Sequence, residues 1–309
     1  MQDWAARMGG NVELRRGIWY AVGAYAVWGL SPLFWNLVPE IGAIDLLINR
    51  VIWSVPMLAI VLVVTRRWRS IGPSYASWRS RLLTGAAAVL LTVNWALFLW
   101  SVTNGYVVEA SLGYFINPLV SIALGVVILG ERLRPLQWAA VGIAAAGVAG
   151  MTLRVGSVPW ISLILAFSFG TYGLLKKRPE TPTPLVSLFG ESTLIAVPAL
   201  IAVLFFREPS GPALGDSLGV TAFLVSTGLI TIVPLLLFGA AAKRIPLSTV
   251  GLLQYIAPTL QFLLGVFLYG EVLTQGKLIG FAIVWLALIL YSYDSFRALR
   301  LRPATVGSA

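Results

Sequence analysis

Apolar stretches of about 20 residues alternate with short polar connections along most of the chain. A helix of about 20 residues is about 30 Å long, which matches the hydrocarbon core of a bilayer. The pattern therefore predicts an all-α integral membrane protein with ten transmembrane helices. The predicted spans are residues 17–38, 43–64, 82–103, 107–129, 136–153, 158–175, 184–206, 218–240, 246–269 and 276–296.

One stretch of this pattern occurs twice. The sequence LGYFINPLVSIALGVVILGERL begins at Leu112 and returns 140 residues later as LLQYIAPTLQFLLGVFLYGEVL, which begins at Leu252. Equivalent residues of the two copies include Pro118 with Pro258, and Gly130-Glu131 with Gly270-Glu271. The copies fall in the fourth and ninth spans, so the chain is predicted to consist of two five-helix repeats. Such duplication is typical of alternating-access transporters.

Basic residues are concentrated in alternate connections. Of the 22 Lys and Arg residues, 18 lie on one side of the predicted topology and three on the other, while Arg50 lies inside a span. Because basic loops stay in the cytoplasm, both termini are predicted to be cytoplasmic. Five spans per repeat is an odd number, so the second repeat is expected to cross the membrane in the opposite sense to the first. The predicted divisions are a cytoplasmic N-terminal segment at 1–16, repeats at 17–153 and 158–296, and a cytoplasmic tail at 297–309.

Composition narrows the classes of function further. Only 11% of the residues are charged and 58% are hydrophobic, whereas a soluble domain is about 25% charged. The chain contains no Cys and no His, which excludes disulfides, zinc sites, haem ligation by these residues and Cys or His catalysis. We therefore expect no cofactor and no metal. The net charge of +10 is accounted for by the cytoplasmic loops, so no nucleic-acid partner is predicted.

Two charged residues lie deep inside predicted spans, about seven residues from an end, where a charge costs about 2.5–3.5 kcal/mol. Arg50 is either a counter-charge for an anionic substrate or intramembrane acid, or a packing residue that pairs with Asp45, five residues earlier. Glu191 has no basic partner in its own span and is a candidate proton or cation coupling site. Aligning Pro56 with Pro198 brings the two charges to nearly equivalent positions in the repeats.

Neutral polar residues gather at mid-depth in the third, fourth and ninth spans. A proline inside a helix kinks it and frees a backbone carbonyl, which is tolerated in the membrane only where protein or water covers it. Predicted kinks at Pro118 and Pro258 therefore favour a central cavity. Its predicted lining residues are Asn94, Tyr114, Asn117, Gln254 and Tyr255.

Several long motifs resemble a known family. They are YAVWGLSPLFW from Tyr25, NRVIWS from Asn49, NWALFLWSVTNG from Asn94, EASLGYFINPLVSIALG from Glu109, LGERLRPLQW from Leu129 and PLSTVGLLQYIAPTLQFLLGV from Pro246. With these motifs, the chain resembles the EamA-domain members of the drug/metabolite transporter superfamily, and more closely the RarD-type, or chloramphenicol-sensitive, proteins. The resemblance implies a permease of the bacterial cytoplasmic membrane. Many relatives carry His-Arg where this chain has Asn49-Arg50, so a proton relay through that histidine cannot operate here.

These observations together predict a secondary-active transporter, with export as the favoured direction, that moves a small organic metabolite or drug by alternating access. Its expected partners are the small-molecule substrate, the lipid bilayer, and a coupled proton or counter-substrate. A facilitative channel is the first alternative. The second is an intramembrane enzyme, which would need a carboxylate pair or a Ser-Lys dyad, and no lysine falls inside a predicted span except Lys277, at the very start of the tenth.

Overall fold

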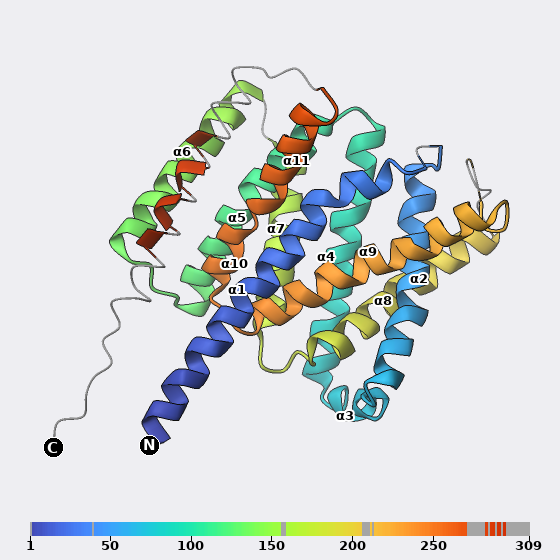
Figure 1. Ribbon diagram of the computed structural model, residues 1–309, viewed down its shortest axis with the longest axis horizontal. Coiled ribbons are helices and arrows are strands. Elements are labelled where there is room, and N and C mark those ends of the chain that lie inside the picture. The colour runs from blue at the N-terminus through green and yellow to red at the C-terminus, as the bar shows by residue number, and fades with distance from the viewer. Residues whose placement is uncertain are drawn as a thin grey trace.

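The fold is described from a computed structural model of the 309-residue chain. The described residues are 2–38, 40–155, 159–205, 211, 213–270, 282–283, 285–287, 289–291 and 293–294. Within these ranges the regular structure is entirely helical (Figure 1). The helices are α1 (Gln2–Trp35), α2 (Ala43–Val64), the 3₁₀ turn η1 (Trp68–Ser70), α3 (Ile71–Ser74), α4 (Trp78–Thr103), α5 (Val107–Leu129), α6 (Pro135–Val155), α7 (Trp160–Lys177), α8 (Pro184–Phe205), α9 (Leu218–Ala242), α10 (Leu247–Leu253) and α11 (Ile256–Phe267).

The helices match the predicted spans as far as residue 269. Six helical segments in the described residues are long and apolar enough to cross a membrane, and the shorter apolar helix Pro135–Gly150 adds to them. The all-α prediction is therefore confirmed. Most of the tenth predicted span, 276–296, lies outside the described residues.

The ninth predicted span is divided into two helices. α10 ends at Leu253 and α11 begins at Ile256, so Gln254 and Tyr255 form a two-residue break. Pro258 follows directly and has no backbone N–H to donate to the carbonyl four residues earlier, which is that of Gln254. The equivalent proline of the first repeat, Pro118, lies inside the continuous helix α5.

Helices of the first half pack mainly on helices of the second half. α1 lies against α9, and its equivalent α7 lies against α4, the equivalent of α9. α5 likewise packs on α7, while α11 packs on α1. Each contact thus has a counterpart in which the two repeats exchange roles. The repeats are interlocked rather than set side by side.

The two copies of the duplicated stretch cross each other in opposite directions. At one end of the crossing, Gly125 of α5 lies against the backbone of Ser248 at the start of α10. Farther along, Gly251 lies against the carbonyl oxygen of Pro118. Residue numbers rise along one helix as they fall along the other, so equivalent segments run antiparallel.

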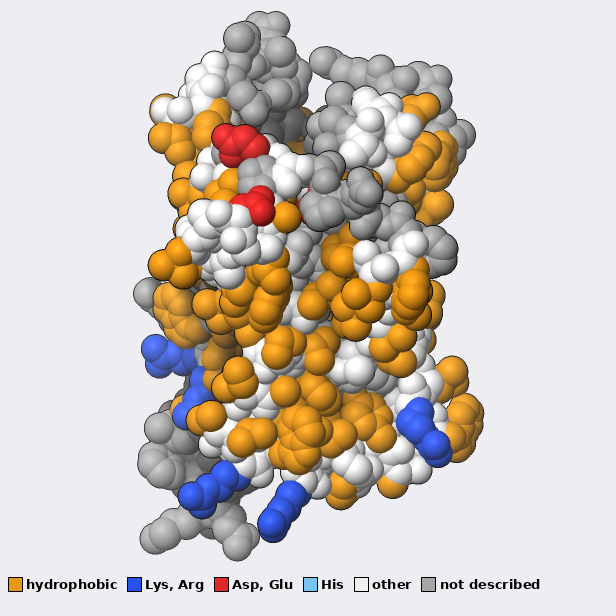
Figure 2. Space-filling model, turned by 90° about the vertical axis from the view of Figure 1, so that its right-hand side faces the viewer, with side chains coloured by type: hydrophobic (Ala, Val, Ile, Leu, Met, Phe, Trp, Pro, Cys, Tyr) orange, Lys and Arg blue, Asp and Glu red, His pale blue; other side chains and the backbone are white. Residues whose placement is uncertain are grey.

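Apolar side chains cover the outside of the bundle as well as its interior. Figure 2 shows an apolar band between one end that carries Lys and Arg and another that carries Asp and Glu. α1 begins at the end where α3 also lies (Figure 1), and the loop residues Arg66, Arg67 and Arg69 beside α3 are exposed. This charge distribution is the one that a bilayer-spanning protein needs.

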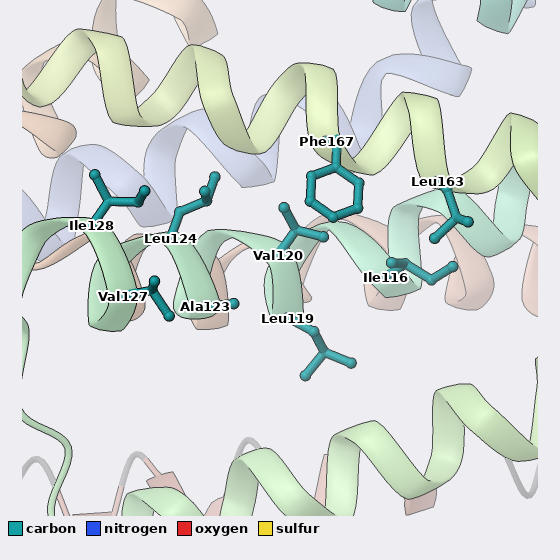
Figure 3. A pocket seen from close by; sticks show the side chains of 9 residues that line it. All are labelled: Ile116, Leu119, Val120, Ala123, Leu124, Val127, Ile128, Leu163 and Phe167. Atoms are coloured by element: carbon teal, nitrogen blue, oxygen red, sulfur yellow. The ribbon is translucent and has the colours of Figure 1, made fainter.

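A groove of about 450 Å³ lies along α5 and α7 (Figure 3). Its lining is entirely apolar and includes the exposed Val127 and Phe167. Because the groove offers no polar group for recognition, it belongs to the apolar surface rather than to the candidate site.

Candidate functional site

Arg50 projects from α2 into the middle of the bundle. Its Nε donates a hydrogen bond of 3.0 Å to Thr231 Oγ1 of α9. Its guanidinium carbon lies 4.6 Å from the ring centre of Trp95 on α4 and 5.8 Å from that of Trp35 on α1. A cation over an aromatic face is stabilised by about 0.5–2 kcal/mol. Four helices thus converge on one positive charge.

These contacts bear on the alternative in which Arg50 pairs with Asp45. Within the described residues, Arg50 forms no ion pair, and its recorded partners lie on other helices. Asn49, the residue before Arg50, donates from Nδ2 to the backbone carbonyl of Asp45 at 2.9 Å. The Thr231 hydroxyl donates to the Thr227 carbonyl at 2.8 Å, which leaves its oxygen free to accept from Arg50. The guanidinium is held by α9 and by two indoles.

Tyr114 on α5 faces the same region. Its ring makes an edge-to-face contact with Phe98 of α4, with 5.8 Å between the ring centres, and Phe98 lies one helical turn from Trp95. Tyr114 nevertheless stays 40% exposed, and Arg50, Trp35 and Trp95 are also partly exposed. These accessible side chains come from α1, α2, α4 and α5. We call Arg50, Trp35, Trp95, Phe98 and Tyr114 the Arg50 chamber.

Two of the predicted lining residues hold helices together. Asn94 Nδ2 donates to the Leu165 carbonyl and to Ser168 Oγ, both at 2.9 Å, and so joins α4 to α7. The buried Tyr255 donates from its hydroxyl to the Phe115 carbonyl of α5 at 3.0 Å. Both side chains use their donors in these bonds between helices.

Asn117 and Gln254 are different. Both are buried, and neither makes a side-chain hydrogen bond within the described residues. Asn117 Oδ1 in particular is enclosed without a partner there. Gln254 occupies the break between α10 and α11, one residue from the contact of Tyr255 with Phe115. Buried polar groups are nearly always satisfied, so unsatisfied ones mark a place where water or a ligand binds.

Glu191 lies apart from this chamber. Its carboxylate is completely buried and forms an ion pair with Lys176, whose side chain is 3% exposed. Ser187 Oγ also donates to it, and Tyr172 donates to its second oxygen at 3.1 Å. Tyr75, from the polar connection that contains α3, donates to the Val186 carbonyl beside this network. The network therefore lies near the end of the bundle where α7 meets α8.

This network corrects one expectation, the place of Lys176. α7 extends to Lys177, so Lys176, which we predicted in a loop, lies in the last helical turn and is buried. Although Glu191 has no basic partner in its own helix, it has one in the neighbouring helix. The residues of this network are spaced four apart on one face of each helix, Tyr172 with Lys176 and Ser187 with Glu191. Of these, only Glu191 was predicted as a site residue from the sequence. This four-residue spacing is the sequence signal from which the network could have been predicted.

The first Gly-Glu motif joins the repeats at the same end. Gly130 ends α5 in the left-handed conformation, with φ of 66°, and turns Glu131 toward α10. The Glu131 carboxylate accepts hydrogen bonds from the backbone N–H groups of Leu247 and Ser248, at 2.6 and 2.9 Å, and from Ser248 Oγ at 2.7 Å. It therefore caps a helix of the other repeat. Its repeat equivalent, Glu271, lies outside the described residues.

The model of the EamA-like transporter family matches the chain twice, over residues 15–153 and 157–293. The chain belongs to the EamA-like transporter family. Its EamA membership is supported by Protein RarD of Streptomyces exfoliatus, which is 46% identical over 96% of this chain and 94% of the relative. The uncharacterized transporter YojE of Bacillus subtilis is 41% identical over 93% of this chain and 97% of the relative.

A solved crystal structure has a similar fold, with a TM-score of 0.69 and 18% sequence identity. The match covers 90% of this chain and 97% of the chain in that structure. That identity is too low to carry more than the fold. With its apolar helices and its relatives, this EamA protein is a RarD-type, multi-pass membrane transporter.

Proposed function

We propose that the protein is a secondary-active transporter of the bacterial cytoplasmic membrane that moves a small organic solute, as an exporter, by alternating access. In this proposal ten helices form two inverted repeats of five, and both termini lie in the cytoplasm. The relatives are transporters by name, which argues against the alternative of an intramembrane enzyme.

The observation that carries the proposal is the antiparallel crossing of the two equivalent segments, α5 and α10–α11. Inverted repeats give one sequence two nearly equivalent arrangements, one open to each side, when the repeats exchange conformations. The helix break at Gln254 and Tyr255 lies at this crossing. Broken helices near the midplane are typical of the substrate sites of secondary transporters.

The chamber beside the crossing is the proposed substrate site. Arg50 and Tyr114 are assigned to it from α2 and α5. Gln254 lies in the break, and the buried Asn117, whose Oδ1 has no partner in the described residues, lies on α5. Asn94 and Tyr255 support this site by holding α4 to α7 and α5 to α10–α11.

The proposed coupling role of Glu191 now involves Lys176 as well. Lys176, Ser187 and Tyr172 all donate to the carboxylate, so a coupling ion would have to displace Lys176 from it. Coupling through this site therefore requires a rearrangement between α7 and α8. Transport by a Glu191→Gln variant with an unchanged pH dependence would show that the carboxylate is structural.

A facilitative channel is the competing function, and counterflow separates the two. A thermal-shift screen of metabolites and drugs on purified protein identifies a solute, which is then loaded unlabelled into proteoliposomes and exchanged against external label. A carrier gives saturable, transient accumulation of label. Flux that rises linearly with solute concentration, without counterflow, would refute alternating access.

The proposed orientation has its own test. The natural chain contains no cysteine, so a single cysteine introduced at Ser70 reports its own accessibility. Ser70 lies beside α3 in the basic connection, and the proposal places it in the cytoplasm. Labelling of this cysteine by an impermeant reagent in intact cells would overturn the topology.

A further inference from the structure

The substrate class follows from the charge that the Arg50 chamber leaves uncompensated. We propose that the chamber binds an aromatic monocarboxylate, with its acid group on Arg50 and its ring against the chamber's aromatic side chains. This inference rests on the proposed transport function, and it specifies the solute.

Arg50 uses one of its three guanidinium nitrogens in a hydrogen bond within the described residues. Only Nε has an acceptor, Thr231 Oγ1, within the described residues. The two terminal nitrogens have none there, and together they form a fork that matches the two oxygens of a carboxylate. Because Nε is engaged by α9, an incoming carboxylate is expected to bind end-on, to the terminal pair. The Trp95 face, 4.6 Å away, keeps the guanidinium in position.

The charged side chains inside the described part of the bundle differ in whether they have a partner of opposite charge. Lys176 and Glu191, the most completely buried charged side chains of the described chain, neutralise each other. Within the described residues, Arg50 forms no ion pair with a carboxylate. An unpaired cation in a site of low dielectric favours an anion, and a single cation favours a single negative charge. A monocarboxylate fits this balance better than a phosphate dianion.

The side chains that accompany Arg50 in the chamber are aromatic. Trp35 and Trp95 lie over the guanidinium, and Phe98, one helical turn from Trp95, makes an edge-to-face contact with Tyr114. Each remains partly exposed, so an aromatic ring can stack on them without displacing the core. The chamber thus offers one anion-binding fork and an aromatic wall, and phenylacetate is a small molecule that has both complementary parts.

Equilibrium binding to the purified full-length protein in lipid nanodiscs tests the proposal without requiring transport. Phenylacetate is compared, by the rise in unfolding temperature with concentration, with its neutral isostere phenylacetamide, with acetate, and with phenyl phosphate. We expect saturable stabilisation by phenylacetate and at least about tenfold weaker binding of the other three, because a charge-assisted hydrogen bond or an aromatic contact is lost or a second charge is added. Equal stabilisation by phenylacetamide, or tighter binding of phenyl phosphate, overturns the assignment.

Variants assign the effect to Arg50. Arg50→Gln is expected to weaken phenylacetate binding at least about tenfold, and Arg50→Lys, which keeps the charge but not the fork, by a smaller factor. If the glutamine variant does not fold, the lysine variant still supplies the test. Arg244→Gln is the matched control, since Arg244 also lies over an aromatic ring, that of Tyr20, but pairs with Glu13 outside the chamber. Unchanged binding by both Arg50 variants refutes the proposal.

Counterflow distinguishes failure of this inference from failure of the transport proposal. If phenylacetate binds through Arg50 but is never exchanged across proteoliposomes, alternating access is wrong and the binding site stands. If a neutral solute shows counterflow that phenylacetate does not inhibit, the transporter stands and the substrate class is wrong.

Discussion

Tyr255 donates a hydrogen bond to the carbonyl of Phe115, the residue that occupies the equivalent position in the other repeat, 140 residues earlier. In an arrangement with two-fold symmetry, equivalent residues touch each other only at the axis. The contact therefore marks where the pseudo-two-fold axis passes between α5 and α10–α11. The bond itself is asymmetric, because the first repeat has Phe where the second has Tyr.

Loss of this bond should weaken the joint between the repeats. Tyr255→Phe removes a buried donor while leaving the ring, and we expect a loss of about 1 kcal/mol in unfolding free energy. Thermal or denaturant unfolding of the purified protein measures it. Tyr293→Phe is the control, because Tyr293 is exposed, and its stability should match that of the parent protein. Equal stability of both variants would mean that the crossing does not depend on the bond.

Close approach at the crossing depends on Gly251. A Cβ atom at this position would lie 2.9 Å from the Pro118 carbonyl oxygen and 2.8 Å from Ser121 Cβ. Gly251→Ala should therefore cost about 1–3 kcal/mol through overpacking. Gly142 of α6 has open space in the same position, so Gly142→Ala should be neutral or stabilising by up to about 1 kcal/mol. If unfolding measurements rank the two variants the other way, the described crossing is wrong.

The Lys176–Glu191 pair should behave as a unit. Removing one partner of a buried ion pair leaves the other charge unpaired, so Lys176→Met or Glu191→Gln alone should cost about 3–5 kcal/mol. The double variant should lose clearly less than the sum of the two, which a double-mutant cycle in unfolding experiments detects. The exposed pair of Glu13 with Arg16 is the control, and Glu13→Gln should change stability little. Additive losses at the buried site would rule out direct coupling.

The sequence predicts the helices well because the demand of the bilayer for apolar length is a local property. Residues 107–129 were predicted as one span, and α5 has those limits. Partners across helices are not local properties. The chain between Arg50 and Thr231 spans most of the protein, and no periodicity connects them. The pairing of Lys176 with Glu191 was missed because a lysine beside Lys177 and Arg178 has the local signature of a cytoplasmic loop, although the helix continues through it.

The predicted cavity lining shows the same limit. Mid-span polar residues were correctly recognised as needing partners, but sequence could not distinguish those satisfied by another helix from those left open. Asn94 proved to belong to the first group, while Asn117 belongs to the second within the described residues. Only the packing of α4 against α7 separates the two cases, because it places the Leu165 carbonyl within reach of Asn94.

The cap that Glu131 places on α10 should hold the two repeats together at the end of the bundle that we propose is cytoplasmic. Glu131→Ala removes the acceptors of two backbone N–H groups and should cost about 1–2 kcal/mol. Because the cap joins α10 to the end of α5, its loss is expected to favour the state in which this end opens. A single cysteine at Ser121, which lies on α5 at the crossing, should then react faster with a thiol reagent applied from the cytoplasmic side.

Two controls separate opening from general loosening. Glu131→Gln keeps one carbonyl oxygen as an acceptor and should lie between the parent protein and the alanine variant in both stability and labelling rate. Glu180→Gln changes an exposed acid in the connection between α7 and α8, and should leave both unchanged. Faster labelling in Glu180→Gln as well, or an equal increase from both sides of the membrane in Glu131→Ala, would argue against a latch between the repeats. An increase in labelling rate from the cytoplasmic side only, largest for the alanine variant, smaller for the glutamine variant and absent in the parent, would show that the Gly-Glu motif holds this end closed.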